Sequence, residues 1–528
     1  MRRCLNAGIF AISIVMLCIA VRQISNKYHF SDILLTEAEI LQIQNSRKES
    51  SKELLTGISI NNFPLIYDET QNGWFYTSSD RKQFPELPID FSASENGVRI
   101  AVPAQADPGH SVPMIAYTDE EYKTYSLVFT SLPLITIDCE TTDIPYNSSL
   151  PVRFTLYENN AEARQPVIYS DGTIHLRGNG TRLYPKKPYR ITLTAQSIGN
   201  SLRENRTSLL GMRKDGDWLL NPAYVDQERI RNVFSSNLWF NSCAGDNIFH
   251  IKNGMEYRFV ELFLNQQYWG LYALGYPADA RQMNISPGID GEYEEFLFKQ
   301  KYWGPVAPDY SDLKRYLPLQ FETDEANEDY GFSILKMYFE HIDSGIPNGL
   351  YNNDETNAID IWLFTKMIQA MDSVSYPGKM NNIIYTIKVL DGERKIIYTP
   401  WDMDATWGNS FNFRQFGNAI IYQLDPTDNS LEMTLNPVSV LLGREDNSRI
   451  SQKIRQRYTE LRSDKWSDEA IDAMLDEFEK EIYDSGAYIR DMERWPDGAY
   501  QDPDLGLSVF RTYVHDRLIS MDDYIERL

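Results

Sequence analysis

Two aspartates, Asp402 and Asp404, stand two residues apart in the segment "YTPWDMDATWGN". The preceding "KIIYTP" is apolar enough for a buried strand, which Pro400 should end. Residues i and i+2 of an extended chain point to the same face, about 7 Å apart. Two carboxylates this close repel unless a cation or hydrogen bonds intervene. Mg²⁺ and Mn²⁺ take such oxygen ligands, so the segment predicts a divalent-cation site. The spacing of the two aspartates alone is explained more simply by an Asp-rich turn that caps a strand and a helix.

A third carboxylate, Asp372, follows an apolar helical segment and precedes the amides Asn381 and Asn382. The order of acid, loop, amide, strand and acidic turn is typical of a phosphotransferase site. There, one carboxylate orients the acceptor hydroxyl, while an amide and the last aspartate hold metal. The alternative is a helix-end aspartate followed by an asparagine turn.

A glycine-rich loop lies in "HLRGNGTRLYPKKPYRITL", with Arg177 beside Gly178 and Gly180. Its backbone amides and its guanidinium could approach phosphate oxygens. Lys186 and Lys187 open the next strand, where one of them could point at an anion. The alternative is an ordinary Gly-Asn hairpin loop with surface lysines.

Histidine and cysteine point to no other chemistry. The 6 histidines form no pair at metal-ligand spacing, and none adjoins a candidate nucleophile. Ser-His-Asp hydrolysis and zinc hydrolysis therefore have no visible constellation. Outside the N-terminal segment only Cys139 and Cys243 remain, as one disulfide or as two free thiols.

The elements that must position these residues alternate between strands and helices. Strand signals come first and helices dominate later, which favours an α+β fold. We expect helices at about 226–242 and 355–371, strand pairs turning at 265–267 and 391–392, and a helical C-terminal part with a Ser467 cap.

Length and composition indicate two folded units plus extensions. The chain has 528 residues, with 42% hydrophobic and 13% aromatic residues, which is enough for a core. Its net charge of −24 argues against nucleic-acid binding, which needs a basic surface. An acidic body favours basic partners, although acidity also serves solubility.

The N-terminus carries Arg2 and Arg3 and an uncharged apolar run from Ala7 to Val21, closed by Arg22. This pattern predicts an uncleaved signal anchor that leaves the folded part outside the membrane. The alternative is a cleaved signal peptide and a secreted protein.

These signals predict four segments along the chain. Residues 1–29 would form a cytosolic tip and membrane anchor, and residues 30–56 a helical stalk. Residues 57–131 alternate in short runs with turn signals, which predicts a small β-rich, sandwich-like domain. Residues 132–528 would form the larger domain.

Six motifs occur in an order that resembles the spore-coat CotH family of atypical, secreted protein kinases. They cover roughly residues 132 to 410. They are "LPLITID", "RGNGT…PKKPYRITL", "DWLLNPAYVDQERIRN", "VELFLNQQYWGLYAL", Asp372 with "NNIIY", and "TPWDMDATWGN".

The resemblance implies a divergent kinase-like fold, ATP as co-substrate, Mg²⁺ or Mn²⁺, and a surface or coat protein as Ser/Thr acceptor. It makes Asp372 the catalytic acid and "WDMD" the metal-binding turn. The metal ligands would be Asp402, Asp404 and Asn381 or Asn382. The nucleotide side would comprise Arg177, Gly178, Asn179, Gly180, Lys186, Lys187, Arg231 and, as a wall, Trp401. Arg231 and Asn232 match the family's "RN", in a structural or a phosphate-side role.

Two stretches depart from the family pattern. Gly180 and Thr181 stand where the family often has a serine in the glycine-rich loop. Gly275 and Tyr276 come after the "GLYAL" strand, which a glutamate commonly follows in the family. Three functions therefore stay open: an extracytoplasmic Ser/Thr kinase, a non-catalytic surface or coat scaffold, and nucleotidyl transfer or sugar binding at the same cleft.

Overall fold

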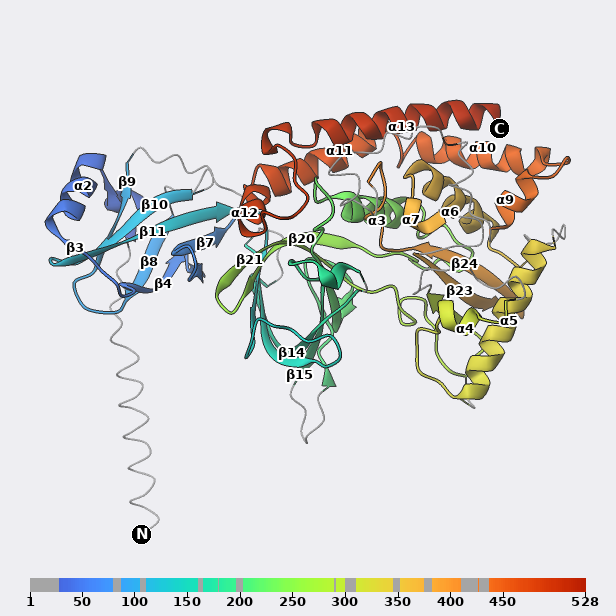
Figure 1. The fold of residues 1–528 in the computed structure, drawn as a ribbon, viewed down its shortest axis with the longest axis horizontal. Helices are drawn as coiled ribbons and strands as arrows, with labels where there is room; N and C mark the ends of the chain where they lie inside the picture. The colour runs from blue at the N-terminus through green and yellow to red at the C-terminus, as the bar shows by residue number, and fades with distance from the viewer. Residues whose placement is uncertain are drawn as a thin grey trace, which may run out of the picture. The chain divides into compact units, whose positions relative to one another are not determined.

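The computed structural model falls into two compact units (Figure 1). The first unit draws on residues 1–142, 152–170 and 261–270, and the second on residues 143–151, 171–260 and 271–528. The structure describes residues 28–78, 87–104, 111–159, 165–178, 180–195, 203–288, 291–299, 310–344, 352–374, 382–409, 426 and 436–528.

The first unit is built from two sheets, of four and seven strands. The four-stranded sheet has the order β1-β8-β4-β5, and the seven-stranded one has β2-β9-β10-β11-β7-β6 with β3 on β11. Ile58 and Phe91 from one sheet join Trp74, Val102 and Leu127 from the other in a single apolar core. The strands are β1 (Tyr28–His29), β2 (Leu34–Leu35), β3 (Lys48–Glu49), β4 (Leu55–Ile60), β5 (Phe63–Pro64), β6 (Ile66–Asp68), β7 (Gly73–Thr77), β8 (Pro88–Ala93), β9 (Arg99–Pro103), β10 (Ser111–Tyr117) and β11 (Glu121–Thr130).

The segment predicted as a helical stalk holds one helix, α2 (Glu37–Ser46), which is shorter than expected. Thr36 begins it with a capping box, in which Glu39 closes the reciprocal hydrogen bond. Ile43 packs with Ala101 and Ile115 of the first unit. The flanking residues form β2 and β3 instead, because they pair with β9 and β11.

The predicted signal anchor, residues 1–29, lies outside the described residues except for its last two. In the part of the chain that the structure describes, we find no helix with the length and apolarity needed to cross a membrane.

Strands β20 (Tyr257–Leu264) and β21 (Gln267–Gly275) form the predicted aromatic-rich hairpin. The two residues between them, Asn265 and Gln266, have φ of +49° and +61°. Positive φ at both central residues defines a type I′ turn, whose twist suits a two-residue hairpin. In the first unit, β20 also pairs in parallel with β12 (Leu134–Asp138), and β12 pairs with β13 (Leu150–Tyr157).

In the second unit, antiparallel strands surround the glycine-rich loop. Strand β15 (Tyr189–Ala195) pairs with β14 (Val167–Leu176) and β19 (Asp217–Asn221), and β19 pairs with β21. Shorter strands complete this part: β16 (Arg203–Glu204), β17 (Thr207–Ser208) and β18 (Lys214–Asp215).

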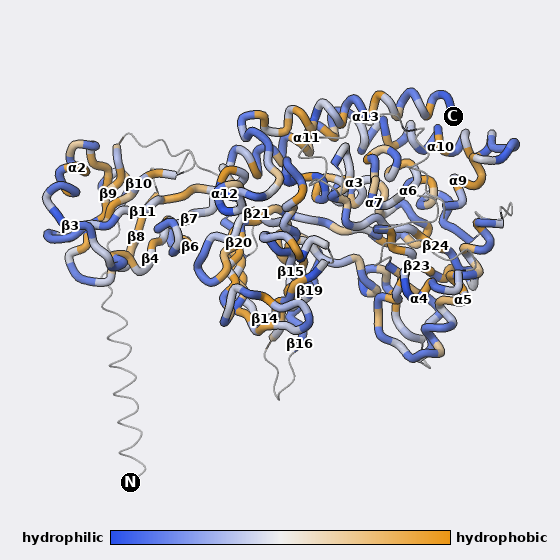
Figure 2. The backbone as a smooth tube through the Cα atoms, in the orientation of Figure 1, coloured by the Kyte–Doolittle hydropathy of each residue, from blue (hydrophilic) through white to orange (hydrophobic). Residues whose placement is uncertain are grey.

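A second sheet of this unit has the order β22-β23-β24 (Figure 1). The turn at Asp391 and Gly392 joins β23 (Ile383–Leu390) to β24 (Glu393–Pro400), as the sequence predicts, and β22 (Phe296–Lys299) pairs with β23. Apolar residues concentrate along β23 and β24 (Figure 2). The "WDMD" turn follows directly after β24, so this sheet positions it.

Helices make up most of the rest. They are α3 (Arg231–Ser242), α4 (Leu313–Tyr316), α5 (Glu325–Asp343), α6 (Glu355–Met367), α7 (Met371–Val374), α9 (Pro437–Leu442), α10 (Ser448–Arg462), α11 (Asp468–Phe478), α12 (Ala487–Arg494) and α13 (Ser508–Arg527). Ser467 caps α11 by accepting a hydrogen bond from the Ala470 N–H, which confirms the predicted start. Helices α11 and α13 run side by side (Figure 1).

Two predicted helix boundaries were wrong. Helix α3 begins at Arg231 rather than near 226, because Ala223 and Arg229 have φ of +47° and +69° and interrupt it. Helix α6 ends at Met367, just before Gln369 with φ of +52°. Left-handed backbone cannot continue a right-handed helix.

The mixed α+β class is confirmed. Cys139 and Cys243 are both free thiols, the first half-buried and the second buried. Of the two alternatives, the free-thiol one is therefore confirmed.

The type I′ turn predicts a stabilising substitution. Gln266→Gly should raise the free energy of unfolding by about 1 kcal/mol, because glycine adopts positive φ without the steric cost that glutamine carries. Urea denaturation would measure the change. Gln266→Ala is the matched control, since alanine removes the side chain but retains the strain. Equal stability of the two variants would contradict this account.

Candidate functional site

The "WDMD" turn follows directly from the end of β24. Asp402 has φ of +57°, so the chain is not extended there and the predicted alternation of side chains is wrong at this point. Two asparagines hold the turn instead: Asn382 O accepts from Trp401 N at 3.0 Å, and Asn232 Oδ1 accepts from Met403 N at 2.8 Å. The two carboxylates are positioned by a hydrogen-bonded turn, not by strand geometry.

Buried hydrogen bonds also fix the second half of this segment. Trp407 N donates to Ile368 O at 2.7 Å, and its Nε1 donates to Ser235 Oγ at 3.0 Å. Gly408 N donates to Gln369 Oε1 at 3.0 Å. Trp407 is thus a buried anchor of this segment.

The predicted catalytic acid lies beside a predicted metal-side amide. Asn382 Nδ2 donates to Asp372 Oδ2 at 2.9 Å and lies 3.5 Å from Asp402 O. Asn382 is buried, with φ of +56°, so both its side chain and its backbone are constrained. The other candidate amide, Asn381, lies outside the described residues.

Three neighbouring carboxylates act on the pKa of Asp404. Burial raises the pKa of Asp404 well above its ordinary value, and the charges of Asp402 and Asp372 raise it further. Asp226 adds a fourth negative charge, while a hydrogen bond from the Ala405 N–H acts in the opposite direction. Such mutual repulsion is what a bound cation relieves.

The donor set suits Mg²⁺, which commonly binds through one or two protein carboxylates and takes its other ligands from water and phosphate. Asp402 and Asp404 provide the carboxylates, and Asn382 lies next to them. Within the described ranges, no group of three or more His, Cys, Asp or Glu residues has the arrangement of an all-protein metal cage. An ion here would need water or a bound ligand to supply its remaining oxygen atoms.

Arg231 is fully buried and ion-paired with Asp226 and Glu228. Asp226 Oδ2 also accepts from Arg231 N at 2.6 Å, which fixes the start of α3. Arg231 Nε lies 3.4 Å from Trp407 O, the carbonyl of the metal turn's anchor. These contacts favour the structural one of the two roles expected for Arg231; its nucleotide-binding role stays a prediction.

Backbone conformation requires glycine in the glycine-rich loop. Gly178 has φ of +80°, and a Cβ there would collide with the Thr181 hydroxyl. Lys187 Nζ donates to Arg182 O at 2.7 Å and so ties the loop to the start of the next strand. Gly180 lies in open space, and Asn179 lies outside the described residues.

Arg177 and Asp402 both act on Tyr257, which starts β20. Burial raises the pKa of Tyr257, the Asp402 carboxylate raises it further, and the Arg177 guanidinium lowers it. A hydrogen bond with Asn232 also lowers it. The loop arginine and the metal turn therefore lie within electrostatic range of one phenol. Trp401 immediately precedes Asp402 in the sequence, and the Lys299 ammonium lies 3.2 Å from its ring centroid.

Lys186 is the buried member of the lysine pair. Its ammonium is fully shielded, lies 2.7 Å from Asp491 Oδ1 and also donates to Leu271 O. Burial lowers the pKa of Lys186 to about 8, and the Asp491 carboxylate opposes that shift. The contact with nucleotide phosphates that we predicted for Lys186 stays a prediction.

Asp491 connects three elements of this unit. Besides Lys186 it accepts from Leu271 N at 2.9 Å and from Arg229 Nε at 3.1 Å. Tyr500 OH donates to its second oxygen at 3.0 Å. Arg229 in turn belongs to the loop that carries Asp226, so α12 supports both the glycine-loop strand and the loop before α3.

Tyr276, which replaces the family's glutamate, is buried and packs against Arg213, whose guanidinium carbon lies 4.3 Å from the ring centroid. Arg213 is itself paired with Asp215 and Asp279. Tyr276 is thus buried against an arginine that is itself ion-paired.

Sequence reasoning missed Asp226 and Asp491. Asp226 lies within a quoted motif, just before the two arginines of "ERIRN", and this position could have identified it as an ion-pair partner. Asp491 gave no signal, because a single acidic residue in a charged helical segment is usually a solvated one. Only the structure shows that it is buried.

The Lys186–Asp491 pair predicts a pH-dependent loss of stability. Asp491→Asn should cost about 3 to 5 kcal/mol of unfolding free energy at pH 6, since it leaves the buried Lys186 ammonium and the Arg229 guanidinium without their carboxylate. The folded-state pKa of Lys186, already depressed to about 8, should fall further. The Lys186 part of the deficit is therefore full below the lowered pKa of the variant and is lost as the pH rises through about 8, so the deficit should be smaller at pH 9 than at pH 6.

Denaturant unfolding at both pH values measures this difference. Glu493→Gln on the exposed side of α12 is the matched control, and adding Lys186→Met should remove the pH dependence. An Asp491→Asn deficit that is equal at pH 6 and pH 9 would contradict the charge-burial explanation.

Comparison with known proteins identifies the family. The family model described as "CotH kinase protein" matches residues 174–521, which is well over half of the chain. No curated protein matches the chain significantly. The matched range contains the glycine-rich loop, Asp372, the "WDMD" turn and Asp491 of α12. The chain therefore belongs to the CotH kinase family.

Proposed function

We propose that this protein is an ATP-dependent atypical protein kinase that transfers the γ-phosphate to Ser or Thr of a surface or coat protein. Family membership supports a kinase-like function. The observation that carries the proposal is that Asn382 bonds Asp372 and lies beside the Asp402 carbonyl, while the charges of Asp402 and Asp372 both act on the buried Asp404. We further propose that the second unit is a divergent kinase fold and the first a sandwich-like module.

In this proposal Asp402 and Asp404, with Asn382 beside them, hold Mg²⁺ or Mn²⁺. The bound ion would neutralise the nucleotide phosphates and the developing negative charge. Asp372 orients the acceptor hydroxyl for in-line attack, and its hydrogen bond from Asn382 keeps it in place. Because the cluster is acidic, it favours basic residues around the acceptor hydroxyl.

The phosphate side of the proposed site is the glycine-rich loop. Arg177 supplies a guanidinium that acts on the same phenol as Asp402, and Gly178 lets the backbone approach closely. Arg231 supports the turn through its contact with the Trp407 carbonyl. For localisation we propose an extracytoplasmic protein, anchored by its N-terminus or secreted after cleavage.

A non-catalytic scaffold is the second candidate, and Tyr276 favours it. This residue is buried and well packed where the family commonly has a glutamate. If that glutamate supports catalysis elsewhere in the family, this chain lacks it. Nucleotide binding separates the two candidates, because a scaffold has no need for it.

Asp404→Asn should abolish metal-dependent nucleotide binding, because it removes one of two metal carboxylates. Calorimetry with ATP, in the presence and absence of Mg²⁺, would measure the affinity. Asp391→Asn, in the exposed β23–β24 turn, is the matched control and should bind normally. Unchanged affinity of Asp404→Asn would eliminate the metal assignment.

Asp372→Asn should leave nucleotide binding intact but reduce phosphate transfer by about 100-fold or more, since the amide cannot act as a base. The reaction to follow is transfer to the protein itself or to a basic, serine-rich peptide. A variant with normal turnover would remove the catalytic role of Asp372.

ATP labelled at the γ- or the α-phosphate separates the proposed reaction from its alternatives. Acceptor labelled only from the γ-phosphate supports the kinase, and acceptor labelled from the α-phosphate indicates nucleotidyl transfer. If wild type shows neither label nor ATP binding, the scaffold becomes the better account.

A further inference from the structure

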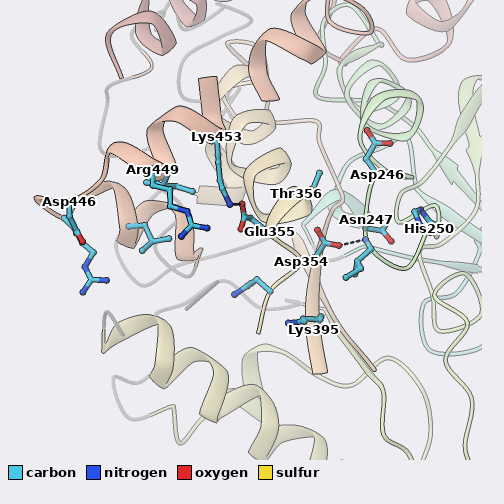
Figure 3. Close-up of a pocket in the computed structure, with 15 residues that line it drawn as sticks. Asp246, Asn247, His250, Asp354, Glu355, Thr356, Lys395, Asp446, Arg449 and Lys453 are labelled. Atoms are coloured by element: carbon cyan, nitrogen blue, oxygen red, sulfur yellow. Dashed lines mark hydrogen bonds and ion pairs between the residues drawn. The ribbon is translucent and has the colours of Figure 1, made fainter. Parts of the chain in front are cut away.

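A pocket of about 740 Å³ lies in the second unit, apart from the acid cluster (Figure 3). The N-terminus of α6, the start of β24 and the α9–α10 region form its walls. Its lining includes four basic residues, Lys395, Arg444, Arg449 and Lys453. No residue to which we assign a role in phosphate transfer lines it.

The acidic residues of this lining are largely engaged. Glu355 is paired with Lys453, and Asp246 Oδ2 lies 2.7 Å from Arg457 Nη2. Asp354 caps α6 by accepting from Asn357 N at 2.8 Å and also accepts from the Ile248 N–H (Figure 3). Their charges are therefore already balanced or hydrogen-bonded.

Two arginines of the lining are not engaged. Among the residues that the structure describes, neither the Arg444 nor the Arg449 guanidinium has an ion-pair or hydrogen-bond partner. Arg449 and Lys453 come from α10 on one side of the pocket, and Lys395 comes from β24 on the other (Figure 3). Asp446 is the exposed acid at the rim. The pocket has spare donors for an oxyanion, and a guanidinium pairs with phosphate through two parallel hydrogen bonds.

The pocket and the acid cluster lie at opposite ends of the same two elements. At the pocket, Asp354 N donates to Ile396 O at 3.0 Å, which places the start of α6 beside β24. At the other end, Met371 N donates to Ala405 O at 3.2 Å. Helix α6 has 13 residues, so at 1.5 Å per residue the two sites are about 20 Å apart. An extended peptide covers this distance with about six residues.

We propose that this pocket binds a phosphoserine or phosphothreonine of an acceptor segment that has already been phosphorylated. The anion preference follows from the lining, whereas the identity of the anion rests on the proposed function, which makes such groups as its product. A phosphate carries about −1.5 to −2 charges at pH 7 and three acceptor oxygens. Held in the pocket, it would place a second hydroxyl, about six residues away, at Asp372.

The chain's net charge of −24 makes this proposal easy to test, since an acidic body repels anionic peptides elsewhere on its surface. The probe is a fluorescent 12-residue peptide with one phosphoserine and one serine six residues away. Its unphosphorylated and glutamate versions are the comparison peptides. Fluorescence anisotropy with the purified full chain, at low and high salt, measures binding.

Wild type should bind the phosphopeptide at least 10-fold more tightly than the unphosphorylated peptide. Arg444→Gln with Arg449→Gln should remove this preference, and Asp446→Asn should strengthen binding about twofold. Arg455→Gln is the matched control, because Arg455 is an exposed arginine of α10 outside the pocket. Thermal melting verifies that each variant is folded.

Three results would overturn the proposal: equal affinity for the three peptides, equal loss of binding in Arg455→Gln, or arginine-dependent binding of inorganic phosphate without binding of the phosphopeptide. Binding to Asp372→Asn keeps the test separate from catalysis. Phosphopeptide binding without any phosphate transfer would support the pocket and count only against the kinase activity. In an active enzyme, the double arginine variant should raise KM for the phosphopeptide and leave kcat unchanged.

Discussion

Repulsion between carboxylates is the constraint on which this site depends. Burial raises the pKa of Asp404, and the charges of Asp402 and Asp372, which come from two chain segments, raise it further. A chain keeps such charges together only where other bonds prevent them from moving apart. Here Asn382, Asn232, Gln369 and Ser235 supply those bonds, and each of them contacts a backbone or indole N–H or a carboxylate next to the cluster.

Those supporting groups depend on a layer of buried ion pairs. Arg231 lies between Asp226, Glu228 and the Trp407 carbonyl, and Arg229 lies between the same loop and Asp491. Buried pairs add little net stability compared with apolar packing, but removing one partner is costly. They therefore act mainly on geometry: a shift of α12 would move the loop before α3, and with it the segment that holds the metal turn.

The sequence predicted what local rules determine. Alternation, turn residues and capping gave both hairpins and the Ser467 start of α11, because each depends on neighbours in the chain. The order of motifs gave the family and the residues of the candidate site. Local rules failed at Asp402, Gln369 and Arg229, where the backbone is left-handed without glycine. Tertiary hydrogen bonds impose that conformation, and no local sequence pattern predicts those bonds. Asp491 was missed for the same reason, since its partners are distant in the chain.

That distance has a consequence for synthesis. Asp491 meets Arg229 across 262 residues and Leu271 across 220. Until α12 has been synthesised, Lys186 and Arg229 lack Asp491, the carboxylate with which they pair in the interior. The nascent second unit must keep both cations hydrated, and so stay partly open, until α12 has emerged. A chain that stops before α12 would be a substrate for chaperones and proteases, because Lys186 and Arg229 could not be buried without Asp491.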